Sequence, residues 1–541
     1  MLQKNQIVRA EVTGFTSDGL GVCRAEGCAV FVPNAAPGEV YDLRIVHIGK
    51  TAAHGRIEHI ITKSPHRVNR LCADAKRCGG CNFWHIDYEA ECEIKRQRVL
   101  DALNRIGGQR LEALILHPAP RCECYRNKAQ YPVASGKGGV YAGFFEKGTH
   151  NVVPIERCRI QPECADKARR AVAAWANRFR IPAYDETAHA GLLRHIYVRL
   201  AEKTGQVLVC LVANGECLPH ETELVETLRT AVPGLCSVQL NTNTRRGNSV
   251  LGEKQRVLWG EETIEDELCG LRFRISPRSF YQVNREQAER LYEKVLEFAG
   301  MSGRETALDL YCGTGTITLC LAKRAETAIG VELVEAAIAD AGENARRNGV
   351  KNARFFCADA GQAAKTLSAE GIRPEVIVVD PPRKGVSADV IEAIDAMAPA
   401  RVVYVSCDPA TLARDVKLLT QRGYRLQTAE AFDMFPRCAH VETVCLLVLR
   451  NPVTHINIDV DVEEMVQDKR GLATYGQIKD YVLEQNGLKV SSLYIAQVKQ
   501  KHGIIERDNY NKPKSEDVRQ PQCPPDKERA ITEALKHFGM I

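Results

Sequence analysis

The stretch at residues 307–324, ALDLYCGTGTITLCLAKR, decides the fold. It starts as a short apolar strand, passes through a glycine-bearing loop and continues as an apolar helix. Glycines in such a loop let the backbone approach a ligand at the carboxyl edge of a parallel sheet. The loop lacks the full G-x-G-x-x-G spacing, so it indicates a ligand-binding strand, loop and helix without naming the ligand.

The segments around this stretch repeat its rhythm. Short apolar strands alternate with helices in AIGVELVEAAIADAGENARRNG, ARFFCADA, VIVVDPPRKG, VVYVSCDPATLARD and TVCLLVLR. This alternation is typical of a doubly wound parallel sheet. We therefore predict a Rossmann-like α/β domain over residues 271–450.

Acidic residues end several of these strands. Glu332 lies nineteen residues after Gly313, where its carboxylate can accept hydrogen bonds from a ribose diol. Asp359 ends the third strand, near where an adenine would lie, and Asp380 ends the fourth in VVDPPRKG. A dehydrogenase could share the first two features, but DPPRKG at the fourth strand favours an S-adenosylmethionine site.

Cys407 follows the strand RVVYVS of the same sheet, so its side chain should emerge at the same edge as Asp380. Most cysteines are small buried hydrophobes, but this position favours a nucleophile. Methylation of a pyrimidine at carbon 5 needs such a thiol, because carbon 5 becomes nucleophilic only after a group adds at carbon 6. A base must then remove a proton, and Glu442 in CAHVETVCLL can do so, although an exposed strand-end carboxylate is the ordinary interpretation.

The N-terminal segment has a different pattern. From residue 7 to 61, short alternating segments are separated by the turns SDGLG and PNAAPGE, which predicts a small β-barrel. Residues 1–70 hold nine Lys or Arg against six Asp or Glu, which suits an oligonucleotide-binding barrel but also a solvated surface. A helix is predicted over 88–106, and a mixed α/β domain over about 120–270.

Three cysteines lie close together in LCADAKRCGGC, with the spacing C-x5-C-x2-C. They are Cys72, Cys78 and Cys81, and Cys158 is a candidate fourth ligand. Such clusters in a cytosolic protein usually bind metal, and four thiolates hold either zinc or an iron–sulfur cluster. We expect the nearby Cys92, Cys122 and Cys124 to be packing residues.

The composition limits the class of protein. A chain of 541 residues is long enough for several domains, and a net charge of +5 points weakly to a polyanionic partner. The sequence has 21 cysteines but shows no secretion signal, and no apolar run is long enough for a membrane span. We therefore expect the protein to lie in the reducing cytoplasm, with its cysteines free for metal binding, catalysis or packing.

The final ninety residues form an extension of unknown role. Thr474 and Gln477 predict a capping box for a helix that ends at Gly487, SSLYIAQVKQKHG predicts a second helix, and a proline-rich stretch leads to a third. The first two helices could form a helix-turn-helix, but plain helical packing is the favoured interpretation.

With these motifs, the chain resembles the RNA uracil-5-methyltransferase family, whose members make 5-methyluridine in ribosomal or transfer RNA. The resemblance covers nearly all of residues 1–450. It rests on the barrel, which looks like a TRAM domain, on the cysteine set, and on SFYQVN, DLYCGTG, VDPPRKG, SCDPATLARD and HVETV. We therefore expect four parts: a TRAM barrel at 1–62, a central domain at 63–270, a methyltransferase domain at 271–450 and the helical extension at 451–541.

The resemblance also implies site residues. It makes Cys407 the nucleophile and Glu442 the proton acceptor. It implies contacts to S-adenosylmethionine from Gln282, Tyr311, Glu332 and Asp380. It implies a [4Fe-4S] cluster, in preference to zinc, on Cys72, Cys78, Cys81 and Cys158. One departure is Thr316, where some members carry asparagine.

Members with both the cluster and the TRAM domain look most like the enzymes that act on large-subunit RNA, so we expect 23S ribosomal RNA, with a transfer-RNA uridine as the alternative. The target uridine should be looped out or flipped. Phe280, Tyr281, Arg126 and Lys128 are candidates to hold it, although a core aromatic pair and a solvated strand describe them equally well. A monomer is favoured. A binding protein without chemistry and a redox sensor are the competing hypotheses.

Overall fold

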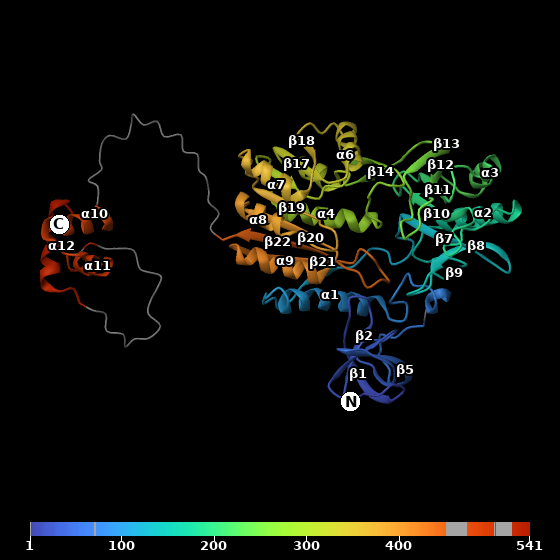
Figure 1. Ribbon diagram of the computed structural model, residues 1–541, viewed down its shortest axis with the longest axis horizontal. Helices are drawn as coiled ribbons and strands as arrows, with labels where there is room; N and C mark the ends of the chain where they lie inside the picture. Colours follow the sequence, from blue (N-terminus) through green and yellow to red (C-terminus); the bar gives the residue numbers. More distant parts are fainter. Residues whose placement is uncertain (1, 70–71, 451–472, 503, 505–521) are drawn as a thin grey trace. The chain divides into compact units, whose positions relative to one another are not determined.

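The computed structural model describes residues 2–69, 72–450, 473–502, 504 and 522–541 (Figure 1). They fall into two compact units, Met1–Val453 and Thr454–Ile541. The first unit contains a closed barrel, a seven-stranded sheet, a two-stranded hairpin and an eight-stranded sheet. No described helix is long and apolar enough to cross a membrane.

The predicted barrel is confirmed at the N-terminus. Its strands close in the order β1-β2-β3-β5-β4. Alternate side chains point inward because successive residues of a strand face opposite sides, so Tyr41, Leu43 and Ile45 are all buried. The strands are β1 (Ile7–Phe15), β2 (Gly21–Ala25), β3 (Cys28–Val32), β4 (Val40–Ile48) and β5 (Ala52–Thr62).

A cysteine-rich loop and a long helix follow the barrel. The loop contains one short 3-10 helix, η1 (Ala73–Lys76), and the helix is α1 (Tyr88–Arg105). The side chain of Asp87 caps α1 by accepting a hydrogen bond from the amide of Ala90. The helix predicted over 88–106 is therefore confirmed to within one residue.

The central sheet has seven strands in the order β13-β12-β11-β10-β7-β8-β9. Its strands are β7 (Lys128–Gly136), β8 (Gly139–Phe145), β9 (Val152–Pro154), β10 (Leu193–Leu200), β11 (Val207–Ala213), β12 (Leu235–Thr242) and β13 (Lys254–Gly260). The helices α2 (Glu163–Arg178) and α3 (Glu221–Ala231) cover one face through a core that includes Trp175, Val198 and Leu228.

The largest sheet has eight strands in the order β18-β17-β16-β19-β20-β22-β21-β6. Strands β16 to β20 are parallel neighbours, whereas β22 pairs antiparallel with both β20 and β21. The predicted parallel sheet is thus present with an antiparallel edge. The strands are β6 (Ile115–His117), β16 (Thr306–Asp309), β17 (Thr327–Glu332), β18 (Ala353–Cys357), β19 (Val376–Val379), β20 (Arg401–Ser406), β21 (Tyr424–Phe432) and β22 (Glu442–Leu449).

Helices cover both faces of this sheet (Figure 1). One core contains side chains from α4 and α5, and the other contains side chains from α1, α7, α8 and α9. The helices are α4 (Arg285–Ala299), α5 (Thr316–Ala322), α6 (Glu335–Arg347), α7 (Ala360–Ala369), α8 (Ala388–Met397) and α9 (Pro409–Gln421). A hairpin of β14 (Ile264–Leu268) and β15 (Leu271–Ile275) precedes them. Strand β6 comes from the segment expected to form the central domain, yet it lies at the edge of this sheet.

The described residues of the second unit form three helices, α10 (Tyr475–Asn486), α11 (Ser492–Lys501) and α12 (Pro525–His537). The predicted capping box between Thr474 and Gln477 is present, and Gly487 ends α10 with a φ of 65°. The helices share a core of their own, which includes Ile478, Ile495 and Leu535 at 0% exposure. Most of the proline-rich stretch before α12 lies outside the described residues.

Candidate active site

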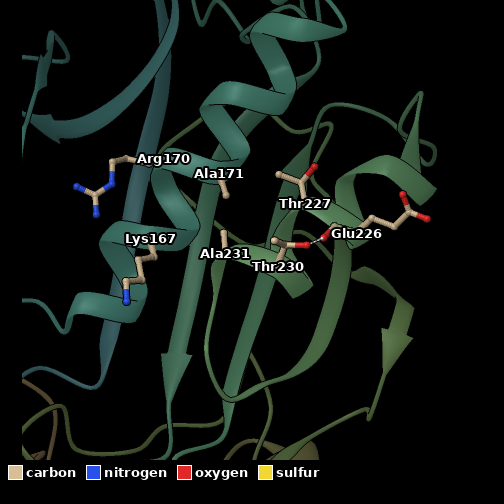
Figure 2. Close-up of a pocket in the computed structure, with 7 residues that line it drawn as sticks. All are labelled: Lys167, Arg170, Ala171, Glu226, Thr227, Thr230 and Ala231. Atoms are coloured by element: carbon tan, nitrogen blue, oxygen red, sulfur yellow. Dashed lines mark hydrogen bonds between the residues drawn. The ribbon is translucent and has the colours of Figure 1, made fainter.

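A pocket of about 1520 Å³ opens at the carboxyl edge of the eight-stranded sheet. Strand β16 lies between β17 and β19 and is parallel to both. The loops that follow β16 and β19 therefore lead to opposite sides of the sheet, and a crevice opens between them. The lining includes every catalytic and cofactor residue that the sequence singles out: Gln282, Tyr311, Glu332, Asp359, Asp380, Cys407 and Glu442. By contrast, the shallow groove between α2 and α3 contains none of them (Figure 2).

The glycine loop after β16 is shaped by its backbone and by Glu332. Gly313 and Gly315 have φ values of 53° and 83°, in the left-handed region that favours glycine. The carboxylate of Glu332 accepts hydrogen bonds from the amide of Gly313 at 3.2 Å and from that of Val334 at 3.0 Å. Glu332 thus ties the loop to the end of β17 at the position expected to face a ribose.

The helix α5 begins directly after the loop, at Thr316. The hydroxyl of Thr316 lies 3.3 Å from that of Tyr292, so the residue that departs from the family pattern has a hydrogen-bond partner in the protein. Beneath the loop, the buried Asp309 accepts a hydrogen bond of 2.7 Å from Thr318. Burial raises the pKa of Asp309 to about 6.

The candidate catalytic groups come from three strand ends. Asp380 follows β19, Cys407 follows β20 and Glu442 begins β22. Burial, together with the charges of Glu442 and Asp380, raises the pKa of the Cys407 thiol to about 11. Burial and the nearby Asp380 raise the pKa of Glu442 to about 8, and Arg383 counteracts this shift. The pocket therefore favours protonated acids unless positive charge is brought into it.

Arg383 and His440 are two of the pocket residues that the sequence analysis did not single out. Arg383 lies within the DPPRKG motif, and its guanidinium is 3.5 Å from the ring of His440 in HVETV. The sequence signal for Arg383 was its place in the motif that also contains Asp380, since a positive charge there acts on Cys407 and Glu442. The two residues of the aromatic pair have different surroundings. Phe280 is 64% exposed at the pocket, whereas Tyr281 is buried and donates a hydrogen bond to Asp266.

The loop that leads into Glu442 is held by the cysteine-rich loop. The amide of Asn82 donates to the carbonyl of Arg437 at 2.7 Å, and the amide of Ala439 donates to the side chain of Asn82 at 3.1 Å. The thiol of Cys438 lies 3.2 Å from the carbonyl of Gly80. The two loops are far apart in sequence but directly bonded in space.

A buried ion network fixes the same loop, which leads into Glu442, to α1. The ammonium group of Lys95 is fully buried and lies 2.7 Å from carboxylate oxygens of both Glu91 and Asp433. It also donates to the carbonyl of Phe435 at 3.1 Å, and Tyr88 donates to Asp433 at 2.8 Å. A buried charge is tolerated only when it is paired in this way, so the network gives the loop one position.

A second pocket, of about 290 Å³, is lined by the four predicted cysteine ligands, Cys72, Cys78, Cys81 and Cys158. All four are free thiols. Within the described part of the chain, no three Cys, His, Asp or Glu side chains are placed to hold one metal ion, so the predicted iron–sulfur cluster is not supported by a ready metal site. Arg126 and Lys128 line this pocket and also the larger one.

Comparison with known proteins gives consistent similarities. A family model described as tRNA (Uracil-5-)-methyltransferase matches residues 87–450, and a TRAM domain model matches residues 2–57. An uncharacterized RNA methyltransferase of Halalkalibacterium halodurans is 43% identical over 453 residues, which cover 83% of this chain and 98% of that protein. Another from Caldanaerobacter subterraneus is 43% identical over 437 residues, or 81% of this chain and 97% of that protein.

Among solved structures, the chain is similar to the tRNA (uracil-54, C5)-methyltransferase of Pyrococcus abyssi in complex with S-adenosyl-L-homocysteine. The TM-score is 0.66 at 28% identity, and the match covers 82% of this chain and 100% of that one. The present chain is longer than these relatives, so part of it has no counterpart in them.

Proposed function

The chain belongs to the RNA uracil-5-methyltransferase family, and from that premise we propose that it methylates carbon 5 of a specific uridine in 23S ribosomal RNA through a covalent bond between Cys407 and the base. It is an RNA methyltransferase with an N-terminal TRAM domain. One observation carries the catalytic part of the proposal: Cys407, Asp380 and Glu442 line the same pocket as the glycine loop.

The residues around the glycine loop suit S-adenosylmethionine. The open backbone at Gly313 and the carboxylate of Glu332 would hold the ribose, and Asp359 would face the adenine. The family resemblance adds contacts from Gln282 and Tyr311, both of which line the pocket. When bound, the cofactor would supply the methyl group and would bring the positive charge of its sulfonium into the pocket. That charge favours the ionised forms of Asp380 and Glu442.

The protein residues would act in a fixed order. Cys407 gives up its proton to water, and its sulfur then bonds to carbon 6 of uracil, which leaves carbon 5 nucleophilic as part of an enolate. After carbon 5 has gained the methyl group, Glu442 removes the remaining proton from carbon 5. The electron pair re-forms the bond between carbons 5 and 6, and the sulfur of Cys407 leaves. Arg383 would stabilise the negative charge that moves between these groups.

We also propose a [4Fe-4S] cluster on Cys72, Cys78, Cys81 and Cys158, with zinc as the alternative. The support is chemical: four free thiols line one pocket, which is the ligand set of both kinds of site. A single zinc ion needs sulfurs that converge on one point, whereas each cysteine of a four-iron cluster binds a different iron. The preference for the cluster over zinc rests on the family resemblance.

A transfer-RNA uridine is the second candidate substrate. The matching family model and the similar Pyrococcus abyssi enzyme both carry transfer RNA in their names. The cysteine set together with the TRAM domain supports ribosomal RNA, because the family resemblance associates that combination with the ribosomal enzymes. The catalytic residues are the same for both substrates.

The test is covalent trapping with 5-fluorouridine-substituted RNA. Fluorine on carbon 5 cannot leave as a proton does, so the enzyme should remain bonded to the RNA after methyl transfer. Anaerobically purified protein is mixed with S-adenosylmethionine and fragments of 23S RNA or transfer RNA, and the product is weighed by mass spectrometry.

Two variants complete the test. Cys407→Ala should give no adduct, whereas Cys357→Ala, which removes an exposed thiol at the end of β18, should behave as the wild type. An adduct on transfer RNA alone would transfer the proposal to the second substrate. An adduct that survives Cys407→Ala would contradict the assigned nucleophile.

A further inference from the structure

Two like charges face each other on the central sheet. Strands β7 and β10 pair antiparallel, with Lys128 directly opposite Arg199. Their neighbours Ala129 and Val198 belong to the core under α2, so Lys128 and Arg199 lie on the other face of the sheet. Like charges directly opposite in a sheet are destabilising, so this pair needs a compensating partner.

Arg199 lacks part of that compensation. Its side chain is only 2% exposed, and its Nη2 donates to the carbonyl of Ser279. The Nε and Nη1 atoms are buried and have no hydrogen-bond acceptor among the described residues. A buried guanidinium with unmet donors costs free energy, and an anion or an ordered water would recover it.

Lys128, the other member of this pair of positive charges, lines the larger pocket. It is half-buried, and burial followed by the charges of Arg199 and Arg126 lowers its pKa to about 8. The two charges that lower this pKa, those of Arg199 and Arg126, are both positive. Lys128 and Arg126 line the pocket that also holds Cys407 and Glu442.

We propose that Lys128, backed by Arg199 and flanked by Arg126, forms a phosphate subsite for the RNA phosphodiester next to the methylated uridine. The proposal deepens the proposed function and rests on it for the position of the base. A nucleotide whose base reaches Cys407 must leave its backbone at the pocket wall, and these are cationic side chains of that wall. Phe280, 64% exposed at the same pocket, offers a flat surface for an unstacked base.

One other anion is available on the protein itself. Lys128 and Arg126 also line the pocket of the four cysteines, whose thiolates are negative when they bind metal. If those thiolates were the partner of Lys128, its removal would leave RNA binding unchanged. The two explanations thus differ in what RNA binding does, and the test is built on that difference.

The experiment measures the salt dependence of RNA binding. The full chain, purified anaerobically, is titrated into a fluorescein-labelled twelve-nucleotide RNA rich in uridine, over a series of KCl concentrations. Each phosphate contact on single-stranded RNA contributes about 0.7 to the slope of log K against log salt. Lys128→Gln is expected to lower that slope by about 0.7 and to weaken binding most at low salt.

Lys137→Gln is the matched control, because Lys137 lies exposed in the turn between β7 and β8 of the same hairpin. It should leave the slope unchanged, and Lys128→Arg should restore it. Equal slopes for Lys128→Gln, Lys137→Gln and the wild type would overturn the proposal. Calorimetric titration with S-adenosylmethionine shows that each variant is folded.

The outcome is separable from that of the proposed function. If the wild type forms no covalent adduct but Lys128→Gln still lowers the salt slope, the phosphate subsite holds and the reaction fails. If the adduct forms and the slope does not change, the subsite fails and the reaction holds.

Discussion

The two pockets of the first unit are built in opposite ways. The proposed catalytic side chains lie at the ends of strands whose register is fixed by pairs such as Val379 with Tyr404 and Ser406 with Thr443. The cysteines stand on loops, with one short 3-10 helix among them. Backbone hydrogen bonds therefore position the catalytic groups before any ligand arrives, whereas the cysteine pocket depends on what fills it and on the loops around it.

The two sites should therefore respond differently to amino-acid substitution. A strand-end site tolerates changes elsewhere in the sheet but loses its chemistry when one side chain is removed. A loop site loses its ligand geometry gradually, and that loss can reach the larger pocket through the bonds between Asn82 and residues 437–439, through the contact of Cys438 with Gly80 and through the residues that the two pockets share. The substitutions and the deletion below test this contrast between the two pockets.

The largest effect is expected for Cys407→Ser. Serine has nearly the same shape but is far less nucleophilic, so the rate of methylation should fall by about 10⁴-fold or more. Binding of S-adenosylmethionine should be unchanged, because the strands hold the pocket without the thiol. Methylation is measured by mass spectrometry of digested RNA. A residual rate within tenfold of the wild type would mean that another group is the nucleophile.

Glu442→Gln should lower the rate by about 10²- to 10⁴-fold, since it removes a base and keeps the volume. For the wild type, kcat/KM should rise with pH through about 8, because burial raises the pKa of Glu442 to about 8 and only the ionised form accepts a proton. A rate that is flat from pH 6 to pH 9 would contradict this assignment of the base.

The same carboxyl affects stability with the opposite sign. In the unfolded chain it ionises near pH 4.3, so between there and about 8 the folded state loses stability as pH rises. Glu442→Gln should therefore melt at a higher temperature than the wild type at about pH 8.5 and at the same temperature at about pH 4. Calorimetry at the two pH values makes the comparison.

A smaller loss is expected from the cysteine pocket. Cys81→Ser should reduce bound iron and lower methylation by about 10- to 100-fold, because it disturbs a loop that only supports the catalytic one. Cys92→Ser, on α1 and outside the pocket lining, serves as the control. Iron is measured by absorbance and metal analysis. An iron content equal to that of the wild type would contradict the assignment of Cys81 as a ligand.

The smallest effect on catalysis is expected when residues 451–541 are deleted. Both pockets are formed by residues before 450, so S-adenosylmethionine should bind the shortened chain as it binds the full one. We expect RNA binding to weaken, which filter binding would detect. An equal loss of cofactor binding would mean that the extension supports the fold of the first unit.

The sequence predicts the parts of this molecule that local patterns encode. Strand ends in DLYCGTG and VDPPRKG bring Gly313, Asp380 and Cys407 to one edge because parallel strands share a carboxyl edge. The helix α1 and the capping box of α10 follow from their own residues. These features need no knowledge of distant contacts.

The rest depends on contacts that no local pattern specifies. Strand β6 has only three residues and finds its place beside β21 through tertiary packing. The separation of Phe280 from Tyr281 depends on the partner that Tyr281 finds in Asp266. The pairing of Lys128 with Arg199 requires the register of two strands about seventy residues apart.

The salt bridge between Lys95 and Asp433 spans 338 residues of chain. During synthesis, the glycine loop is complete long before Asp433 leaves the ribosome, and closing so large a loop is slow. Until Asp433 is synthesised, Lys95 can pair with Glu91 on its own helix but not with Asp433. We expect nascent chains to acquire cofactor binding first and the catalytic loop last, so an unfinished enzyme could hold its methyl donor without yet being able to use it.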